Sequence, residues 1–191
     1  MKTAQSKRLG RSIARIGRST GGEGIEPFAT CFRIVGHGRF LGARHYLHSN
    51  DISAPEQLAI REASGRVLPV KAWKLSLPGD LAIFETDGAA CDPLELDLRL
   101  PRDGADLVIV GYPQQGELEW IEGPVSGWDT IKLGEGIEFD GFFVDCEAKD
   151  GMSGSPALDP KTGAAVAVLS GINPDLGIAA FCPLPSHGWE D

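Results

Sequence analysis

The chain has 191 residues, enough for a substantial buried core, and its apolar content of 42% and charged content of 24% are ordinary for a globular protein. Its formal net charge of −9 argues against a general nucleic-acid binder, which needs an excess of basic side chains. No run of 18 apolar residues occurs, and this excludes a transmembrane helix by length.

Residues 1–22 are a basic segment with six Lys or Arg side chains and no Asp or Glu. The rest of the chain therefore holds 12 basic and 27 acidic side chains, a charge of −15. We expect residues 1–22 to form a flexible or weakly helical arm that is either solvated or in contact with an acidic surface. Arg15 and Arg18 interrupt the apolar residues near the start, so the segment does not have the apolar centre of a signal peptide.

The four cysteines are widely spaced, and no C-x-x-C pair indicates zinc. Because no secretion signal is recognised, we expect free thiols in a reducing compartment and predict a cytoplasmic protein. The cysteines are Cys31, Cys91, Cys146 and Cys182.

Short apolar runs, many of them rich in β-branched or aromatic residues, recur at intervals of about ten residues, separated by Gly, Pro, Asp and Asn. This pattern predicts an all-β protein, a sandwich or a barrel. Helix is expected only in the basic arm and in a short segment at residues 54–63. We expect an N-terminal β-unit at residues 23–95, a polar linker at residues 96–104 and a C-terminal β-unit at residues 105–191.

His45 is the best-placed general base among the four histidines. It follows the apolar residues 40–43, where the small Gly42 and Ala43 leave space for an imidazole that faces a cleft. The other three histidines are predicted to be turn, surface or terminal residues, and they are His37, His48 and His187.

Asp80 is the candidate for the group that orients this base. It comes directly before the apolar residues 81–84, and acids are rarely buried without a partner. A carboxylate there can accept the imidazole Nδ1–H and stabilise the cation that forms during catalysis. A turn aspartate after Pro78 and Gly79 is the alternative interpretation.

Ser153 is the candidate nucleophile, because residues 151–156 read Gly-Met-Ser-Gly-Ser-Pro between two apolar runs. A serine hydroxyl needs a neighbouring base and backbone N–H groups directed at the oxyanion that it creates. Glycines accept positive φ and let the backbone approach a substrate carbonyl closely. A plain tight turn is the alternative, so the assignment depends on His45 and Asp80, which precede Ser153 in that order.

The order of these segments resembles that of the chymotrypsin-like (trypsin-fold) serine peptidases, and specifically the bacterial, non-secreted type. Residues 40–47, 80–84 and 151–156 resemble the family segments around the catalytic histidine, aspartate and serine. Residues 110–113 resemble the Gly-aromatic-Pro opening of the second barrel in many bacterial members. The likeness spans roughly residues 28–183.

The resemblance implies two perpendicular six-stranded antiparallel β-barrels with a catalytic cleft between them. It implies a serine endopeptidase that cleaves a protein or peptide substrate through an acyl-enzyme intermediate, with His45, Asp80 and Ser153 as the triad. The N–H groups of Gly151 and Ser153 correspond to the oxyanion hole. The resemblance implies neither a metal nor an organic cofactor.

Four residues depart from the family pattern. Arg44 stands where a small alanine is usual, Tyr46 replaces a disulfide cysteine, and Ser155 replaces a second glycine. Met152 replaces the aspartate that pairs with a new N-terminus in zymogen-activated relatives. We therefore expect folding to form the oxyanion hole directly.

The resemblance places the substrate pocket at Glu147, Ser170 and Gly171, with Ser170 in the position of a serine that hydrogen-bonds the catalytic aspartate. A buried Glu147 would favour Lys or Arg at the cleaved position unless Lys149 neutralises it. An exposed loop acid is the other interpretation. We expect a preference for basic or small residues.

Two other functions are alternatives to a serine peptidase. An α/β-hydrolase esterase needs Gly-x-Ser-x-Gly, but Ser155 occupies the last glycine position, and the 38 residues after Ser153 are too few for the rest of that fold. A catalytically weak or inactive trypsin-fold module that binds a peptide or protein remains the alternative, since fold does not fix function. Regulation by a protein partner is a further hypothesis.

Overall fold

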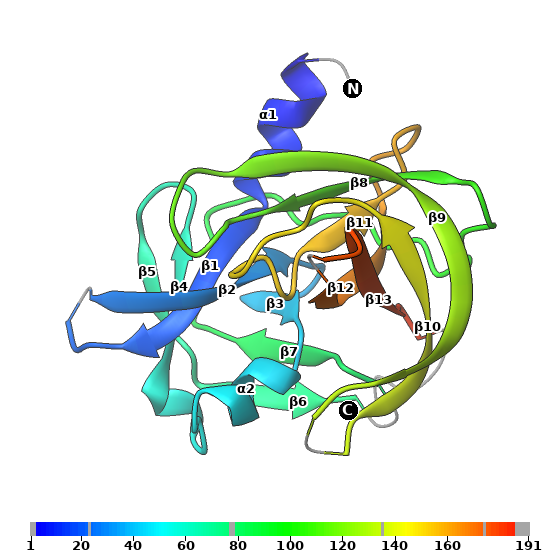
Figure 1. The fold of residues 1–191 in the computed structure, drawn as a ribbon. Helices are drawn as coiled ribbons and strands as arrows, with labels where there is room; N and C mark the ends of the chain where they lie inside the picture. Colours follow the sequence, from blue (N-terminus) through cyan, green and yellow to red (C-terminus); the bar gives the residue numbers. More distant parts are fainter. Residues whose placement is uncertain (1–2, 23, 77–78, 135, 174, 186–191) are drawn as a thin grey trace.

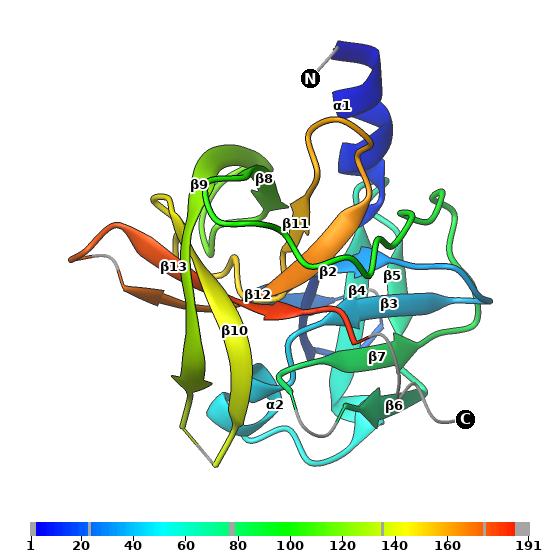
Figure 2. The same cartoon turned by 90° about the vertical axis from the view of Figure 1, so that its right-hand side faces the viewer.

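The computed structural model describes residues 3–22, 24–76, 79–134, 136–173 and 175–185, so His187 lies outside the described residues. Strands dominate this part of the chain, and every pair of neighbouring strands is antiparallel. The all-β prediction is therefore confirmed. The helical elements are α1 (Thr3–Arg11), α2 (His45–Ser49) and the 3₁₀ turn η1 (Pro55–Gln57), with α1 and α2 at opposite ends of the molecule (Figures 1 and 2).

The first half of the chain forms a curled sheet of seven strands in the order β5-β4-β1-β2-β3-β7-β6. The resemblance implied a closed six-stranded barrel, but in the described residues this hydrogen-bonded ladder does not close. Residues 70–71 connect the two edge strands of this curled sheet: Val70 N–H donates to the Leu58 carbonyl, and Lys71 N–H donates to the Glu85 carbonyl. The strands are β1 (Ile13–Ser19), β2 (Ile25–Arg33), β3 (Arg39–Gly42), β4 (Leu58–Glu62), β5 (Val67–Pro69), β6 (Ala72–Leu75) and β7 (Ala82–Glu85).

The second half forms a closed six-stranded barrel in the order β10-β13-β12-β11-β8-β9. Figure 2 shows this barrel beside the first sheet. The strands are β8 (Asp106–Gly111), β9 (Glu119–Lys132), β10 (Glu138–Asp145), β11 (Pro156–Leu158), β12 (Ala165–Asn173) and β13 (Ile178–Pro183).

The predicted basic arm at residues 1–22 is helical in α1, as expected, but the prediction of a separate arm is wrong for residues 13–19. Strand β1 lies inside the first sheet, between β4 and β2, and Ile13 and Ile16 are fully buried. The strand was not predicted because Arg15 and Arg18 are typical of a solvated segment. Arg15 and Arg18 instead donate hydrogen bonds to the backbone carbonyls of Pro113 and Asn50. A β-bulge between Ile16 and Gly17 further breaks the alternation expected of a strand.

The predicted helical segment at residues 54–63 is also wrong for most of its length. After the single 3₁₀ turn, its residues form β4, which pairs with β1 on one side and with β5 on the other. Helix propensity is a weak preference, and burial of Leu58 and Ile60 in the sheet overrides it.

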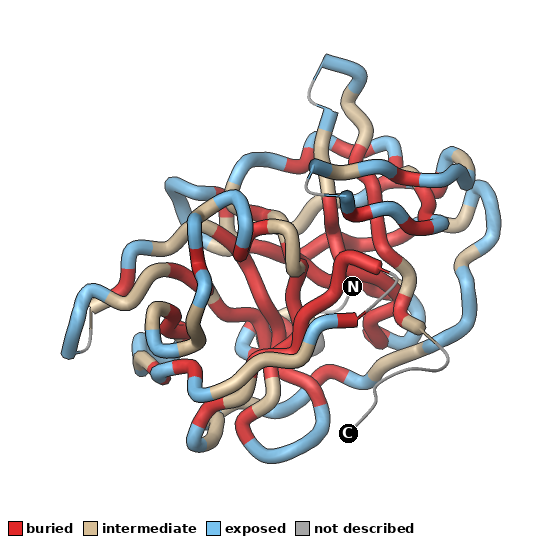
Figure 3. Tube along the Cα trace, turned by 90° about the horizontal axis from the view of Figure 1, so that it is seen from below, coloured by how far each residue is buried: buried red, intermediate tan, exposed pale blue. Residues whose placement is uncertain are grey.

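One apolar cluster joins the two halves of the molecule. It contains Phe32, Phe40 and Phe84 from the first sheet together with Val108 and Val168 from the barrel. A second cluster fills the barrel itself, where the rings of Phe142 and Phe181 stack with centroids 5.5 Å apart. Buried segments accordingly run through the middle of the chain trace, and exposed residues gather in the peripheral loops (Figure 3). This shared core fixes the loops at the junction between the halves.

Candidate active site

The pairing of β3 with β7 brings His45 and Asp80 together. Gly42, the last residue of β3, is the antiparallel partner of Ala82, the first residue of β7. Two residues beyond this pair, Arg44 lies opposite Asp80, and its N–H lies 3.4 Å from the Asp80 carbonyl oxygen. Helix α2 begins at the next residue, His45. The end of one strand and the start of its partner therefore present a histidine and an aspartate side by side.

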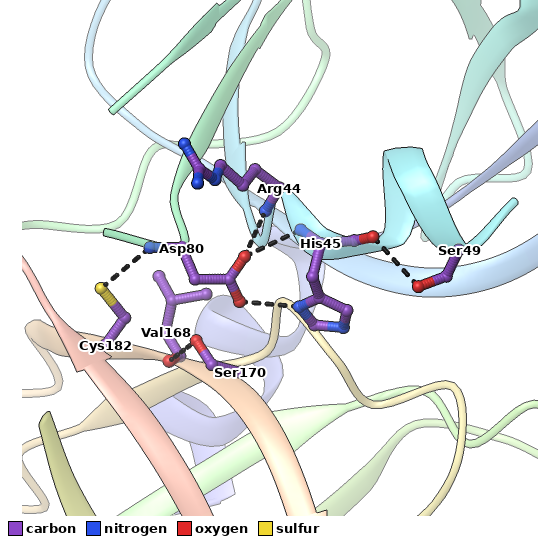
Figure 4. A network of polar contacts seen from close by, with 7 residues as sticks. All are labelled: Arg44, His45, Ser49, Asp80, Val168, Ser170 and Cys182. Carbon is purple, nitrogen blue, oxygen red and sulfur yellow. Dashed lines mark hydrogen bonds and ion pairs between the residues drawn. The ribbon is translucent and has the colours of Figure 1, made fainter. Parts of the chain in front are cut away.

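The Asp80 carboxylate is fully buried and accepts three hydrogen bonds from the start of α2 (Figure 4). Its Oδ1 accepts the N–H of His45 at 2.8 Å and that of Arg44 at 3.1 Å. Its Oδ2 lies 2.7 Å from Nδ1 of the His45 ring. Because a carboxylate only accepts, Nδ1 carries the proton of a neutral ring and Nε2 keeps its lone pair. This tautomer can act as a general base.

Cys182 lies behind Asp80, on the barrel side of the site. The N–H of Asp80 points at its Sγ, at a distance of 3.5 Å (Figure 4). Burial, with a smaller contribution from the Asp80 charge, raises the pKa of the Cys182 thiol to about 12. The thiol is therefore neutral at physiological pH and adds no second negative charge beside the carboxylate.

The loop that carries Ser153 is held against the first sheet. The Ser153 carbonyl accepts the N–H of Thr30, on β2, at 2.9 Å, and Gly154 N–H donates to Leu169, on β12, at 2.8 Å. Gly154 has φ +86°, and a Cβ at this position would lie 3.2 Å from the N atom of Ala43, two residues before His45. Only a glycine allows this close approach without strain. Tertiary contacts therefore bring the serine loop to the histidine segment.

The hydroxyl of Ser153 and Nε2 of His45 have no hydrogen-bond partner among the described residues. Hydrogen bonds between catalytic groups are often long or poorly aligned until substrate binds.

The directions of the Gly151 and Ser153 N–H groups are set by hydrogen bonds to the carbonyls of the preceding residues, which belong to the same peptide planes. The Asp150 carbonyl accepts the N–H of Gln114 at 2.7 Å, and the Met152 carbonyl accepts the N–H of Ser155 at 2.9 Å. In a trans peptide the N–H points away from the C=O, so the N–H groups of Gly151 and Ser153 point to the opposite side. Neither N–H group has an acceptor among the described residues.

The unusual residues beside Ser153 have packing roles. Met152 is fully buried in the apolar cluster of the barrel, where a carboxylate would lack a partner. Ser155 is also fully buried, its Oγ has no hydrogen-bond partner among the described residues, and its side chain packs against the backbone of Gly111. Arg44 extends away from the site, and its guanidinium lies 3.4 Å from the Ser76 carbonyl.

Two of the residues predicted for the substrate pocket have defined side-chain surroundings, and one expectation, the hydrogen bond of Ser170, is not met. Glu147 is exposed, which agrees with the loop-acid interpretation, and Lys149 pairs with Glu119 at 2.7 Å instead of with Glu147. The Ser170 hydroxyl donates to the Val168 carbonyl at 3.4 Å, so the implied hydrogen bond to Asp80 is wrong (Figure 4).

A bulge in β12 explains this difference. Leu169 and Gly171 pair with consecutive residues of β13, which leaves Ser170 unpaired between them and directs its hydroxyl back along its own strand. Gly171 is half-buried on the same strand.

The sequence does not single out Thr30 or Gln114, which hold the serine loop in place. Thr30 N–H holds the Ser153 carbonyl, its hydroxyl lies 3.1 Å from the Gly151 carbonyl, and Gln114 N–H holds that of Asp150. These contacts are between backbone groups or reach across about 80 to 120 residues, so no local motif signals them. All four cysteines are free thiols.

The described part of the chain contains no cluster of three or more His, Cys, Asp or Glu side chains suited to a metal ion. Within the same residues, no helix is long and apolar enough to cross a membrane.

A curled antiparallel sheet packed on a closed six-stranded barrel, with a histidine–aspartate pair and a serine loop at their junction, defines the trypsin-fold class. The sequence pattern described as "Trypsin-like peptidase domain" matches residues 29–168. The chain therefore belongs to the trypsin-like peptidase family.

Solved structures agree with this fold. The Rv3671c protease of M. tuberculosis matches with a TM-score of 0.75 in an inactive form, a serine-to-alanine mutant, at 16% identity over 94% of this chain and 84% of that chain. Its active form also gives a TM-score of 0.75, at 17% identity over 94% of this chain and 78% of that one. The serine endoprotease of Yersinia pestis gives 0.68, at 18% identity over 96% of this chain and 62% of that one. A search of curated proteins finds no match.

Proposed function

We propose that this protein is a serine endopeptidase with His45, Asp80 and Ser153 as its catalytic triad. The observation that carries the proposal is the buried pair of Asp80 and His45, with 2.7 Å between Oδ2 and Nδ1. A fully buried carboxylate that also accepts two backbone N–H groups holds the ring in one tautomer. That is the arrangement a serine nucleophile requires of its base.

The reaction proceeds in two halves. Ser153 Oγ attacks the peptide carbonyl while His45 Nε2 takes the hydroxyl proton, and the N–H groups of Gly151 and Ser153 bind the oxyanion. The tetrahedral intermediate collapses as His45 protonates the leaving amine, which departs and leaves an acyl ester on Ser153. Water then attacks the ester with His45 again as base, and this step releases the acid and restores the serine hydroxyl.

A non-catalytic peptide-binding module is the second candidate function. It is favoured by the unpartnered Ser153 hydroxyl among the described residues. The equal TM-scores with an active and an inactive form of the same protease do not separate the two candidates.

A fluorophosphonate probe tests the proposal, because phosphonylation requires an activated nucleophile. We expect stoichiometric labelling of wild type at Ser153, none in Ser153→Ala, and normal labelling in the control Ser126→Ala, whose hydroxyl is on the exposed face of β9. Peptide hydrolysis by Ser153→Ala should fall by about 10³-fold or more. Wild type that neither labels nor cleaves a mixed peptide library would refute the peptidase proposal, and retention of uncleaved peptides from that library would support the binding module.

A further inference from the structure

We propose that Arg15, on β1, is a positioning residue for the oxyanion hole and acts on it through two peptide planes in series. The inference rests on the proposed role of Gly151 as an oxyanion donor.

The contacts form a continuous chain from the arginine to that donor. Arg15 Nη1 donates to the Pro113 carbonyl at 3.2 Å. The N–H of the same peptide plane belongs to Gln114, and it donates to the Asp150 carbonyl at 2.7 Å. The N–H of that second plane belongs to Gly151. Each plane therefore accepts a hydrogen bond at its C=O and presents its N–H to the next group.

This geometry fixes the direction of the Gly151 N–H. A planar trans peptide holds its C=O and N–H in opposite directions, so holding the carbonyl of each plane sets where its N–H points. A hydrogen bond from a charged donor is also stronger than one from a neutral donor. The positive charge of Arg15 polarises both planes in the same sense, which makes Gly151 N–H a better donor to a developing negative charge.

Further contacts secure the arginine and the loops that it joins. A second nitrogen, Arg15 Nη2, donates to the Gly116 carbonyl, and the guanidinium lies 4.3 Å from the centroid of the Tyr112 ring. Thr30, the neighbour of Arg15 across the β1–β2 ladder, accepts the N–H of Tyr112 at 3.0 Å.

The two loops themselves are in close contact. A Cβ at Gly151 would lie 2.7 Å from the Cα of Gln114, so no side chain fits between them. Residues 112–116 are therefore held on one side by Arg15 and Thr30 and on the other side by the serine loop. We call this series of hydrogen bonds, from Arg15 through Gln114 to Gly151, the relay.

This arrangement explains how the hole forms without an ion pair to a new N-terminus. Met152 is buried in the apolar core and offers no carboxylate for such a pair. The cation that supports the hole comes instead from β1, a strand of the folded chain.

Arginine variants test the first link. Arg15→Met keeps the aliphatic stem and removes all donors, whereas Arg15→Lys keeps the charge and can donate to the Pro113 carbonyl. The control is Arg61→Met, the register partner of Arg15 on β4, whose side chain has no hydrogen bond or ion pair with the other described residues. Each variant is compared by thermal unfolding, by kcat and KM on a fluorogenic peptide, and by inhibition with a peptide aldehyde that forms an oxyanion on Ser153.

Loss of a complete oxyanion donor lowers kcat by about 10²- to 10³-fold, so a donor that is weakened or misdirected should lower it by about 10- to 100-fold. We expect this loss in Arg15→Met, an equal weakening of aldehyde inhibition, and a KM within about twofold of wild type. Arg15→Lys should recover part of the loss, and Arg61→Met should match wild type. Unchanged kcat and aldehyde inhibition in a folded Arg15→Met, with wild type active, would overturn the inference and leave the peptidase function standing.

Variants of Gln114 test the second link even if Arg15→Met fails to fold. Gln114→Pro removes the N–H that donates to Asp150, and Gln114→Ala keeps it. We expect the proline variant to lose kcat and aldehyde affinity by about 10- to 100-fold and the alanine variant to retain both. Equal activity of the two variants would overturn the relay. An inactive wild type that fluorophosphonate does not label would refute the peptidase function itself.

Discussion

The clearest test of the site's chemistry is Asp80→Asn, because the change keeps the shape of the side chain and alters one hydrogen bond. If the amide oxygen takes the place of Oδ1, it still accepts the N–H groups of Arg44 and His45. The amide NH₂ then faces Nδ1 of the ring. Two donors cannot share this contact, so the imidazole must move its proton to Nε2, and it can no longer accept the proton of Ser153.

The alternative orientation of the asparagine is less stable. Turning the amide by 180° would restore an acceptor for Nδ1–H, but the NH₂ would then face two backbone donors. The Arg44 N–H would keep the Asp80 carbonyl oxygen, 3.4 Å away, but the His45 N–H would lose its acceptor, at a cost of about 1–3 kcal/mol. The wrong tautomer is therefore preferred. In the triad template its effect is about 10⁴-fold in kcat, which is about 5.4 kcal/mol at about 1.36 kcal/mol for each power of ten.

Two measurements check this prediction. Hydrolysis of a fluorogenic peptide should fall by about 10⁴-fold in Asp80→Asn, and the rate of fluorophosphonate labelling should fall with it. The matched control is Asp103→Asn, at an exposed aspartate with no ion pair among the described residues. A folded Asp80→Asn protein that labels within about threefold of the wild-type rate would refute the assignment of Asp80 as the orienting group.

Two further predictions concern stability. Gly154→Ala places a Cβ against the Thr30 carbonyl at φ +86°, so its free energy of unfolding should fall by about 1–3 kcal/mol in denaturant titrations, with Gly65→Ala, at an open turn, as the comparison for backbone strain alone. An equal effect of the two changes would contradict the close packing. The pKa of Cys182 is raised from 9.0 to about 12, so the folded state keeps this proton when the unfolded chain has lost it. Its contribution to stability should therefore be complete below pH 9.0 and decline towards pH 12, by up to about 1.4 kcal/mol per pH unit. Cys182→Ala should flatten that part of the stability curve, and an unchanged slope would show that the thiol is not protected.

Much of the fold was predictable because its strands are short apolar runs with clear turn residues between them. The exception is β1, where Arg15 and Arg18 use their charges to hold distant carbonyls and so resemble the side chains of a solvated arm. The predicted helix at residues 54–63 is wrong for a different reason. Strand β4 lies between β1 and β5, and this tertiary pairing outweighs the local preference for helix.

The candidate site also contains residues that local sequence predicted and residues whose arrangement depends on tertiary pairing. Asp80 was recognisable from its place before an apolar strand, and the structure has its hydrogen bond to His45. The catalytic roles of these residues stay predictions. The predicted hydrogen bond from Ser170 to Asp80 is wrong because a bulge in β12 sets the direction of the Ser170 side chain. That bulge arises from the pairing of β12 with β13, so the sequence of β12 alone does not predict it.

The sequence by itself determined the all-β class and the order of histidine, aspartate and serine segments, since both depend on residues that are neighbours in the chain. Only the tertiary structure decided which groups direct the Gly151 and Ser153 N–H groups and how β1 supports the serine loop. Those contacts join backbone groups of segments far apart in sequence. Almost every residue type carries the same backbone N–H and C=O groups, so the pattern of side chains does not predict which backbone groups will form hydrogen bonds with each other.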